Sequence, residues 1–366
     1  MSQHWPRSSR PFFHPFMFNP KAPIIRGGVF IPIIRMSMSR RLLSLIIVIS
    51  FFLFSGCGQS VAQKREDAVI SANILLTKKK YDEAITLLEG AGRDVKSVRY
   101  LKALASAYAG KGGFNVLKLF ADDLALVSTP SPMGGMSRFS TSDDMTTATD
   151  SDFVNLQKAI DLLLYAGGVD TSVNPTVAER GVFFNASDAS EINVLLMYLV
   201  LVQTGRYFQF YGNTSALGIK GGGTQGNVCF LNYQNLAFAG GPPNDMNALQ
   251  ASGATGACNV LLNGHASLGT PGSYQTARLC QGVVLLNNFL AIFPSVVAGV
   301  SGTNFDAIKA LESVINTAKA LAEVATPGTD ARVSTSLSQT KCESDNAASD
   351  VYLQTYFAFI METLVQ

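Results

Sequence analysis

Residues 81–114, "YDEAITLLEGAGRDVKSVRYLKALASAYAGKGGF", decide the fold because they hold two apolar stripes on either side of a short polar stretch. Each stripe follows the spacing i, i+3, i+4, i+7: Tyr81, Ala84, Ile85 and Leu88, then Leu101, Leu104, Ala105 and Tyr108. That spacing places four side chains on one face of a helix. The stretch therefore predicts two amphipathic helices whose apolar faces are buried.

The pattern extends backwards to about residue 66 and repeats when it is shifted by 33 residues. Small and apolar residues then coincide: Ala68 with Leu101, Ala72 with Ala105, Leu75 with Tyr108, and Tyr81 with Phe114. Small residues recur where helices must approach closely, and aromatic residues recur just after a turn. This pattern resembles the tetratricopeptide repeat (TPR), a helix–turn–helix unit of about 34 residues.

The TPR resemblance implies roles for individual residues. Ala72 and Ala105 take the small position of each first helix, Tyr108 its aromatic position and Gly112 the turn glycine; Tyr81 and Phe114 open the second helices, where Ala84 is the small residue. The match departs at Lys79, which replaces the first turn glycine, and at Leu117, which replaces an alanine. No proline closes either unit. We expect TPR-like helical hairpins over residues 68–127.

A second decisive segment lies upstream, at "LIIVISFFLFSGCGQS", residues 45–60. Arg40 and Arg41 precede an apolar run from Leu42 to Phe54, which is a signal-peptide length and short for a helix that spans a bilayer. Phe54-Ser55-Gly56-Cys57 resembles the lipobox of bacterial lipoproteins, with Phe54 where leucine is usual. The alternatives are an ordinary secretory signal with a chance cysteine, or a short uncleaved anchor.

The lipoprotein resemblance implies that Cys57 receives a diacylglycerol, that the chain is cut before it, and that the new amine is acylated. Several acyl chains hold a protein firmly to a bilayer, whereas one chain anchors reversibly. Residues 36–56 would then be the signal peptide and 57–67 a lipidated tether. Gly58 is not the aspartate that retains many lipoproteins in the inner membrane, so the outer membrane is favoured, with the exposed face left open.

Residues 1–35 have no acidic residue, many prolines and no steady period, so we interpret them as a start assigned too early or as an unstructured leader. Seven of the 28 basic residues precede Cys57, which leaves 21 against 26 acidic ones. This mildly anionic remainder offers no electrostatic footprint for nucleic acid. It is long enough for one large or two modest domains.

Four cysteines remain after Cys57: Cys229, Cys258, Cys280 and Cys342. An even number in an exported chain favours two disulfides, for which three pairings exist. We favour Cys229–Cys258, closing the glycine-rich insertion, and Cys280–Cys342, tying the last helices together. Free thiols are the main alternative. A metal site is disfavoured because no CxxC spacing occurs and His265 is the sole histidine after Cys57.

The rest of the chain is expected to be helical. Residues 128–152 form a polar loop, and 153–366 a helical domain with helices at 153–168, from Ser190 onward, and at about 277–300, 304–325 and 348–365. A third helix–turn–helix is expected to turn at Gly205-Arg206-Tyr207. A glycine-rich insertion occupies about 213–276, where a disulfide would give order. No run alternates with period 2. The fold class is all-α: TPR-like hairpins, or an α-solenoid-like domain, with a disulfide-tied insertion.

Motifs that carry chemistry give no catalytic site. Gly221–Gly226 satisfies GxGxxG but lacks the flanking strand and helix of a dinucleotide site, and His265 has no neighbouring nucleophile motif. Asp122-Asp123 and Asp143-Asp144 are interpreted as solvated charges, and Lys78-Lys79-Lys80 as an exposed turn. We expect no metal, no cofactor and no enzymatic activity.

Two functions remain. The first is a lipid-anchored envelope scaffold or adaptor, because stacked helix pairs form concave surfaces that bind partner proteins. The second is a periplasmic substrate-binding or transporter-accessory lipoprotein that carries a small ligand. It is motivated by eight aromatic residues, which could also simply fill a core: Tyr198, Tyr207, Phe208, Phe210, Tyr211, Phe230, Tyr233 and Phe238.

Overall fold

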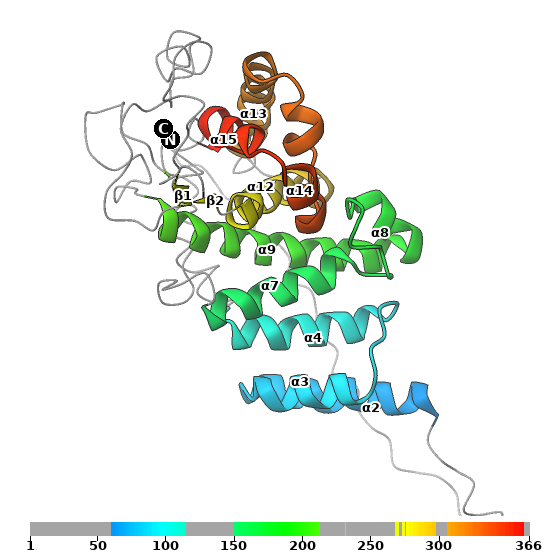
Figure 1. Cartoon of the computed structure of the whole chain (residues 1–366). Helices are drawn as coiled ribbons and strands as arrows, with labels where there is room; N and C mark the ends of the chain where they lie inside the picture. Colours follow the sequence, from blue (N-terminus) through cyan, green and yellow to red (C-terminus); the bar gives the residue numbers. More distant parts are fainter. Residues whose placement is uncertain are drawn as a thin grey trace, which may run out of the picture. The chain divides into compact units, whose positions relative to one another are not determined.

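The computed structural model describes residues 60–114, 150–212, 231, 268–270, 273–274, 276–297 and 306–361 (Figure 1). Every described residue belongs to the unit Gln59–Gln366. The expected leader, signal segment and Cys57 therefore lie outside the described residues. So do the segment 115–149 and most of the glycine-rich insertion.

The described part of the chain is almost entirely helical, which confirms the all-α class. The helices are α2 (Val61–Thr77), α3 (Tyr81–Gly90), α4 (Val98–Lys111), α7 (Ser151–Leu164), α8 (Val177–Phe183), α9 (Ala186–Tyr211), α12 (Thr276–Val297), α13 (Asp306–Ala325), α14 (Gln339–Asp345) and α15 (Val351–Tyr356). Two π-helical segments, η4 (Asp330–Ser334) and η5 (Phe357–Met361), accompany them. Two-residue strands β1 (Gly269–Thr270) and β2 (Ser273–Tyr274) form one antiparallel pair.

Successive helices pack against one another. The helices α2 and α3 pair with each other and both contact α4, α4 packs on α7, α7 on α9, and α9 on α12 (Figure 1). The small-residue positions that the sequence singles out lie inside this packing, since Ala72, Ala84 and Ala105 are all fully buried. Helices that present only a methyl group can approach closely, which explains why alanine occupies these three positions.

Helix α2 begins earlier than expected, so the tether predicted over residues 57–67 is wrong from Val61 onward. Ser60 caps the helix: its hydroxyl accepts from the Gln63 amide at 3.2 Å, and the Gln63 side chain accepts from the Ser60 amide at 3.3 Å. This reciprocal arrangement is a capping box, which satisfies two backbone donors at a helix N-terminus. The spacing Ser60–Gln63 is a local signal that could have placed the boundary.

The turn after α2 requires a left-handed residue, and Lys79 occupies it with a φ of 56°. Lys80 N donates to Leu75 O at 2.9 Å, and Lys79 N to Leu76 O at 3.0 Å. This is the Schellman pattern, which normally ends in glycine. The same pattern ends α4, where Gly113 has a φ of 75°. The left-handed residue equivalent to Lys79 is therefore Gly113, one residue beyond the expected turn glycine Gly112.

Helix α9 runs unbroken through the position where a third turn was expected, so that prediction is wrong. It begins at Ala186 with Asn185 as its cap, not at Ser190, and ends at Tyr211. The Tyr207 ring lies against Gly282 of α12, where an added Cβ would come within 2.7 Å of the ring. Packing against α12 thus holds the Gly205-Arg206-Tyr207 stretch in the helix. Tertiary contacts override the weak helix preference of glycine here.

The C-terminal helices match the expected positions closely but not completely. Helices α12 and α13 occupy the ranges predicted from periodicity. The expected helix at 348–365 is shorter in its described part, because α15 ends at Tyr356 and η5 continues to Met361. Two short helices were missed, α8 and α14, each in a polar stretch. Thr176 and Glu179 form a capping box on α8, and Ser338 caps α14.

Helix α12 is the one helix in the described residues that is long and apolar enough to cross a membrane, over Thr276–Val296. Two thirds of its most apolar window, 67 %, is buried inside the protein. It packs against α9, α14 and α15, and it contains two buried asparagines, Asn287 and Asn288. These contacts are those of a core helix.

A disulfide joins Cys280 of α12 to Cys342 of α14, with their Cα atoms 5.7 Å apart. It is the pairing that the sequence favoured for these two cysteines. The bond closes a loop of 62 residues that contains α13, η4 and the start of α14. Constraining a loop of this length in the unfolded chain contributes about 4 kcal/mol in the chain-entropy model. Cys229 and Cys258 lie outside the described residues.

Replacing Lys79 with glycine should stabilise the protein. The left-handed conformation costs a residue with a Cβ roughly 1–2 kcal/mol, and glycine avoids that cost while losing more entropy on folding. We expect Lys79→Gly to raise the free energy of unfolding by about 0.5–1 kcal/mol in urea denaturation. Lys78→Gly is the matched control: Lys78 has a φ of -92°, so it should give no gain. Equal effects at both positions would contradict this account of the turn.

Candidate functional site

Most residues that the sequence singled out for chemistry lie outside the described residues. These are Cys57, Cys229, Cys258, His265, the Gly221–Gly226 loop and the Asp122-Asp123 and Asp143-Asp144 pairs. Lys78, Lys79 and Lys80 are described, and all three are exposed. Lys80 forms an ion pair with Glu83 at 2.7 Å, three residues further along. These lysines therefore occupy the exposed turn that the sequence predicted.

The aromatic residues proposed to line a ligand site fill the core instead, as far as they are described. Tyr207, Phe208 and Tyr211 are buried, and Tyr198 and Phe210 pack against the same core. The rings of Tyr207 and Tyr211 lie 4.9 Å apart, and those of Phe210 and Tyr211 4.8 Å apart in an edge-on arrangement. None of these five lines either cavity described below. Phe230, Tyr233 and Phe238 lie outside the described residues.

Two arginines are buried, and both serve the packing of helices. Arg206 of α9 donates to Gly112 O at the end of α4 and to Asp152 O at the start of α7. Arg180 of α8 donates to Pro175 O at 2.5 Å and to Leu164 O at 3.4 Å. Desolvation lowers the pKa of each guanidinium to about 10, so both stay charged at neutral pH.

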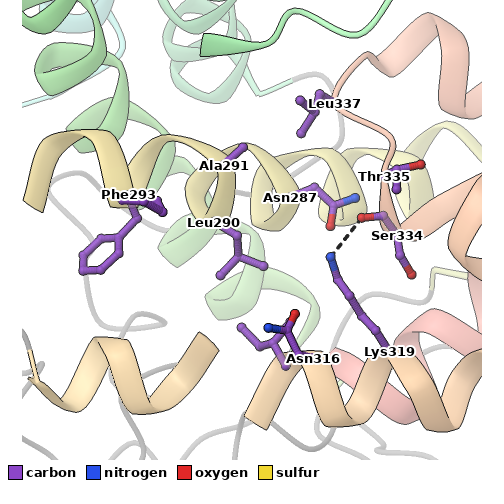
Figure 2. Close-up of a pocket in the computed structure, with 11 residues that line it drawn as sticks. Asn287, Leu290, Ala291, Phe293, Asn316, Lys319, Ser334, Thr335 and Leu337 are labelled. Carbon is purple, nitrogen blue, oxygen red and sulfur yellow. Dashed lines mark hydrogen bonds between the residues drawn. The ribbon is translucent and has the colours of Figure 1, made fainter. Parts of the chain in front are cut away.

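A first cavity, of about 300 Å³, lies between α12, α13 and η4 and is called the α12–α13 cavity below (Figure 2). Its walls combine apolar residues with a few polar ones: Asn287, Leu290, Ala291, Phe293, Pro294, Ile315, Asn316, Lys319, Ser334, Thr335 and Leu337. Phe293, Ile315 and Ser334 are buried in its walls, whereas Asn316 and Thr335 are exposed. The cavity therefore has a mainly apolar lining with a few polar groups, both in its buried part and at its exposed edge, which is typical of small-ligand sites.

Asn287 and Asn288 of α12 fix one wall of this cavity. The Asn287 amide nitrogen donates to Val333 O at 2.8 Å and to Ser336 O at 2.9 Å, and its oxygen accepts from the Tyr356 hydroxyl at 2.7 Å. The Asn288 amide nitrogen donates to Leu337 O at 2.8 Å. These bonds pin the backbone from residue 333 to 337 onto α12. Cys280–Cys342 fastens the same two parts of the chain nearby.

Lys319 is the one cation among the described residues that line the α12–α13 cavity. Its side chain extends from α13 across the cavity, and the ammonium donates to Ser334 O at 3.1 Å (Figure 2). Desolvation lowers the pKa of this ammonium, and the more distant charge of Asp330 opposes that effect. Sequence reasoning missed this lysine, although a signal existed: it stands four residues after Ile315 on the apolar stripe of α13.

A second, more open cavity of about 450 Å³ lies beside α7 and is called the α7 groove below. Charged and aromatic residues from α3, α4, α7 and α14 and their connections line it: Glu89, Arg93, Tyr108, Lys158, Asp161, Leu162, Tyr165, Thr171, Gln339 and Thr340. It thus joins segments that are up to about 250 residues apart in the sequence. Such a surface depends on the folded packing and gives no local sequence signal.

The α7 groove offers groups of both signs. The Tyr108 hydroxyl donates to a Glu89 carboxylate oxygen at 2.6 Å, and the Lys158 ammonium lies 5.4 Å from the centre of the Tyr108 ring. Burial and the Glu89 hydrogen bond raise the pKa of Tyr108 to about 12. Arg93 and Lys158 form no ion pair with any described residue. They are free to meet carboxylates of a partner.

Asp161 is the carboxyl group of the groove whose pKa is raised towards neutral pH. Surrounding protein atoms desolvate its carboxylate and raise its pKa to about 6, although a Gln157 amide that donates at 3.0 Å works in the opposite direction. The residue keeps an exposed face, so water screens part of this effect. The direction of the shift is towards the neutral, protonated form of the Asp161 carboxyl.

Both cavities offer groups that can bind a ligand or a partner. Among the described residues, no group of three or more His, Cys, Asp and Glu side chains is placed to hold a metal ion. The α12–α13 cavity offers an ammonium inside apolar walls, and the α7 groove offers exposed charges beside tyrosine rings. No family model, curated protein or solved structure matches the chain.

Removing the Asn287 side chain should loosen the wall of the α12–α13 cavity. Asn287→Ala leaves Ser336 O and the buried Tyr356 hydroxyl without their partner, whereas Val333 O keeps the Ser336 amide as a donor; each unsatisfied buried group costs about 1–3 kcal/mol. We expect the free energy of unfolding in urea to fall by roughly 3 kcal/mol or more. Asn316→Ala, at the exposed rim, is the control and should change it by less than about 0.5 kcal/mol. Similar values for both would refute the structural role of Asn287.

The Asp161 carboxyl should make stability depend on pH. Its folded pKa of about 6 lies above the ordinary value of an aspartate, so its protonation stabilises the fold below about pH 4 and this contribution is lost as the pH rises through 6. Asp161→Asn mimics the neutral form. We expect its melting temperature to exceed that of the wild type above pH 6.5 and the difference to shrink towards pH 4. A difference that does not vary with pH would show that the carboxylate is solvated normally.

Proposed function

We propose that this chain is a lipid-anchored protein of the bacterial envelope, and that it acts without catalysis as a helical scaffold or adaptor for protein partners. Residues 40–57 are the main support for this proposal. Two arginines, a short apolar run and Phe54-Ser55-Gly56-Cys57 occur there in the order of a lipoprotein signal. The acylated Cys57 would hold residues 58–366 beside a bilayer. The outer membrane is the favoured location.

The Cys280–Cys342 disulfide supports a location outside the cytosol. Disulfides persist in oxidising compartments such as the bacterial periplasm and are rare in the cytosol. The cysteines that form it lie in α12 and α14, deep in the packed core, and both are fully buried. A glycine-rich insertion tied by a second disulfide, Cys229–Cys258, remains part of the proposal.

The TPR-like interpretation of the N-terminal helices is likewise a proposal. Its support is the order α2, α3, α4, each packed on the next, with alanine at the three close contacts Ala72, Ala84 and Ala105. The two Schellman turns, at Lys79 and Gly113, are 34 residues apart, which equals the TPR period. Helix α7 packs against α4, which continues the pairwise packing of α2, α3 and α4.

The α7 groove is the proposed contact surface for a polypeptide partner. Arg93 and Lys158 can pair with carboxylates, Asp161 and Glu89 can accept from basic side chains or backbone amides, and the tyrosine rings supply apolar area. Groups of both signs beside aromatic rings suit a peptide segment better than a nucleic acid, which requires a cationic surface.

One experiment with the full chain in bacterial cells tests the anchor and the groove together. A fatty-acid analogue should label the wild type and not Cys57→Ala, and Cys57→Ala should leave the membrane fraction. After cross-linking, the wild type and a Lys64→Ala control on exposed α2 should co-isolate the same envelope protein, and Arg93→Ala/Lys158→Ala should lose it. An unlabelled wild type would overturn the anchor, and co-isolation that is unchanged in the double variant would overturn the groove as the contact surface.

A second candidate function is favoured by the α12–α13 cavity. A partly enclosed cavity with apolar walls and one cation is the kind of site that a carrier of a small ligand needs. This supports the alternative of a periplasmic substrate-binding or transporter-accessory lipoprotein. The described aromatic residues that first suggested a carrier do not contribute, since they fill the core.

A further inference from the structure

The α12–α13 cavity places a half-buried ammonium among apolar side chains, and no carboxylate of the residues that the structure describes lines it. Lys319 forms one hydrogen bond, to Ser334 O, and no ion pair with any described residue. Asp330 acts on it only through its longer-range charge. A cation that is partly removed from water without a paired anion is costly, so an anion bound here gains more than it would at the surface.

A second polar group in the same wall lacks a partner. The Ser334 hydroxyl is buried, the residue is 3 % exposed, and no described residue forms a hydrogen bond with it. Ser334 also supplies the carbonyl that positions the Lys319 ammonium. This hydroxyl is covered by protein atoms, so a ligand in the cavity does not reach it. The Lys319 ammonium is therefore the polar group on this side of the cavity that is available to a ligand.

The opposite side is apolar. Leu290 projects from α12 into the space between α12 and α13, where Ile315 and Phe293 are buried (Figure 2). Leu337 completes this lining from the segment that Asn287 and Asn288 hold. The volume of about 300 Å³ corresponds to about ten water molecules of the liquid, so it suits a small molecule and not a long lipid chain.

We propose that the α12–α13 cavity binds a small organic acid, with its carboxylate on the Lys319 ammonium and a short aliphatic body against Leu290, Ile315 and Leu337. A neutral hydrocarbon would leave the ammonium unpaired. A bare inorganic anion would leave the apolar walls in contact with water. This assignment gives the small-ligand alternative a chemical class, and it does not depend on the adaptor proposal, which the Cys57 and α7-groove variants test.

The test is a calorimetric titration of the full chain, held in lipid nanodiscs, with octanoate. We expect saturable binding of one octanoate per chain, after subtraction of the heat measured with empty nanodiscs. Octanol, which has the same body without the charge, and acetate, which has the charge without the body, should each bind at least tenfold more weakly. A hydrogen bond to a charged group contributes about 1.5–3 kcal/mol, equivalent to a change in affinity of roughly 10–100-fold.

Three variants make the test specific. Lys319→Met keeps the length of the side chain and removes its charge, and it should weaken octanoate binding at least tenfold. Ala291→Phe, at an exposed position of the wall, should block binding by filling the cavity while Lys319 stays in place. Lys64→Met, at an exposed site on α2, should bind octanoate as the wild type does. Unchanged affinity in Lys319→Met, or no saturable binding by the wild type, overturns the proposal.

Discussion

The carbonyl groups at the ends of buried helices need hydrogen-bond donors. The stacking of the helices in this protein depends on which side chains supply those donors. Arg206 of α9 reaches across to the end of α4 and the start of α7, where it donates to Gly112 O and Asp152 O. A guanidinium near a helix C-terminus also meets the negative end of the helix dipole. One side chain therefore orders three helices whose sequence positions span nearly 100 residues. Without it, Gly112 O at the end of α4 would lose its side-chain donor, whereas Asp152 O would keep its intrahelical partner in the first turn of α7.

In the C-terminal half, side-chain amides supply the hydrogen-bond donors that backbone carbonyl groups need. Asn287 and Asn288 lie in the middle of an apolar helix and hold the backbone of residues 333–337, which has left regular helical hydrogen bonding after η4. Because the disulfide and these amides fix the wall independently of any ligand, the space between α12 and α13 is already formed. A preformed cavity spares a ligand the cost of ordering it.

Local features could be predicted from the sequence, and most long-range ones could not; the Cys280–Cys342 disulfide is the exception, because cysteines are few and pair with one another. The stripes around Leu88 and Leu104 identified helices because helical spacing needs only neighbours along the chain. The course of α9 through Gly205 could not be predicted, since it depends on α12, more than seventy residues further on. The cavities share this property: Lys319 and Asn287 were visible as polar residues in apolar patterns, but the α7 groove has no sequence signature. The segments around Cys57 and Cys229 remain predictions.

The contact between Tyr207 and Gly282 couples two distant positions. The phenol ring occupies the space that any Cβ at position 282 would need, and both residues are buried between α9 and α12. An alanine at 282 is tolerated only if the ring at 207 shrinks or shifts. Related chains should therefore exchange these two residues together, large with small and small with large. Such paired exchange would identify homologous chains even where the rest of the sequence has diverged.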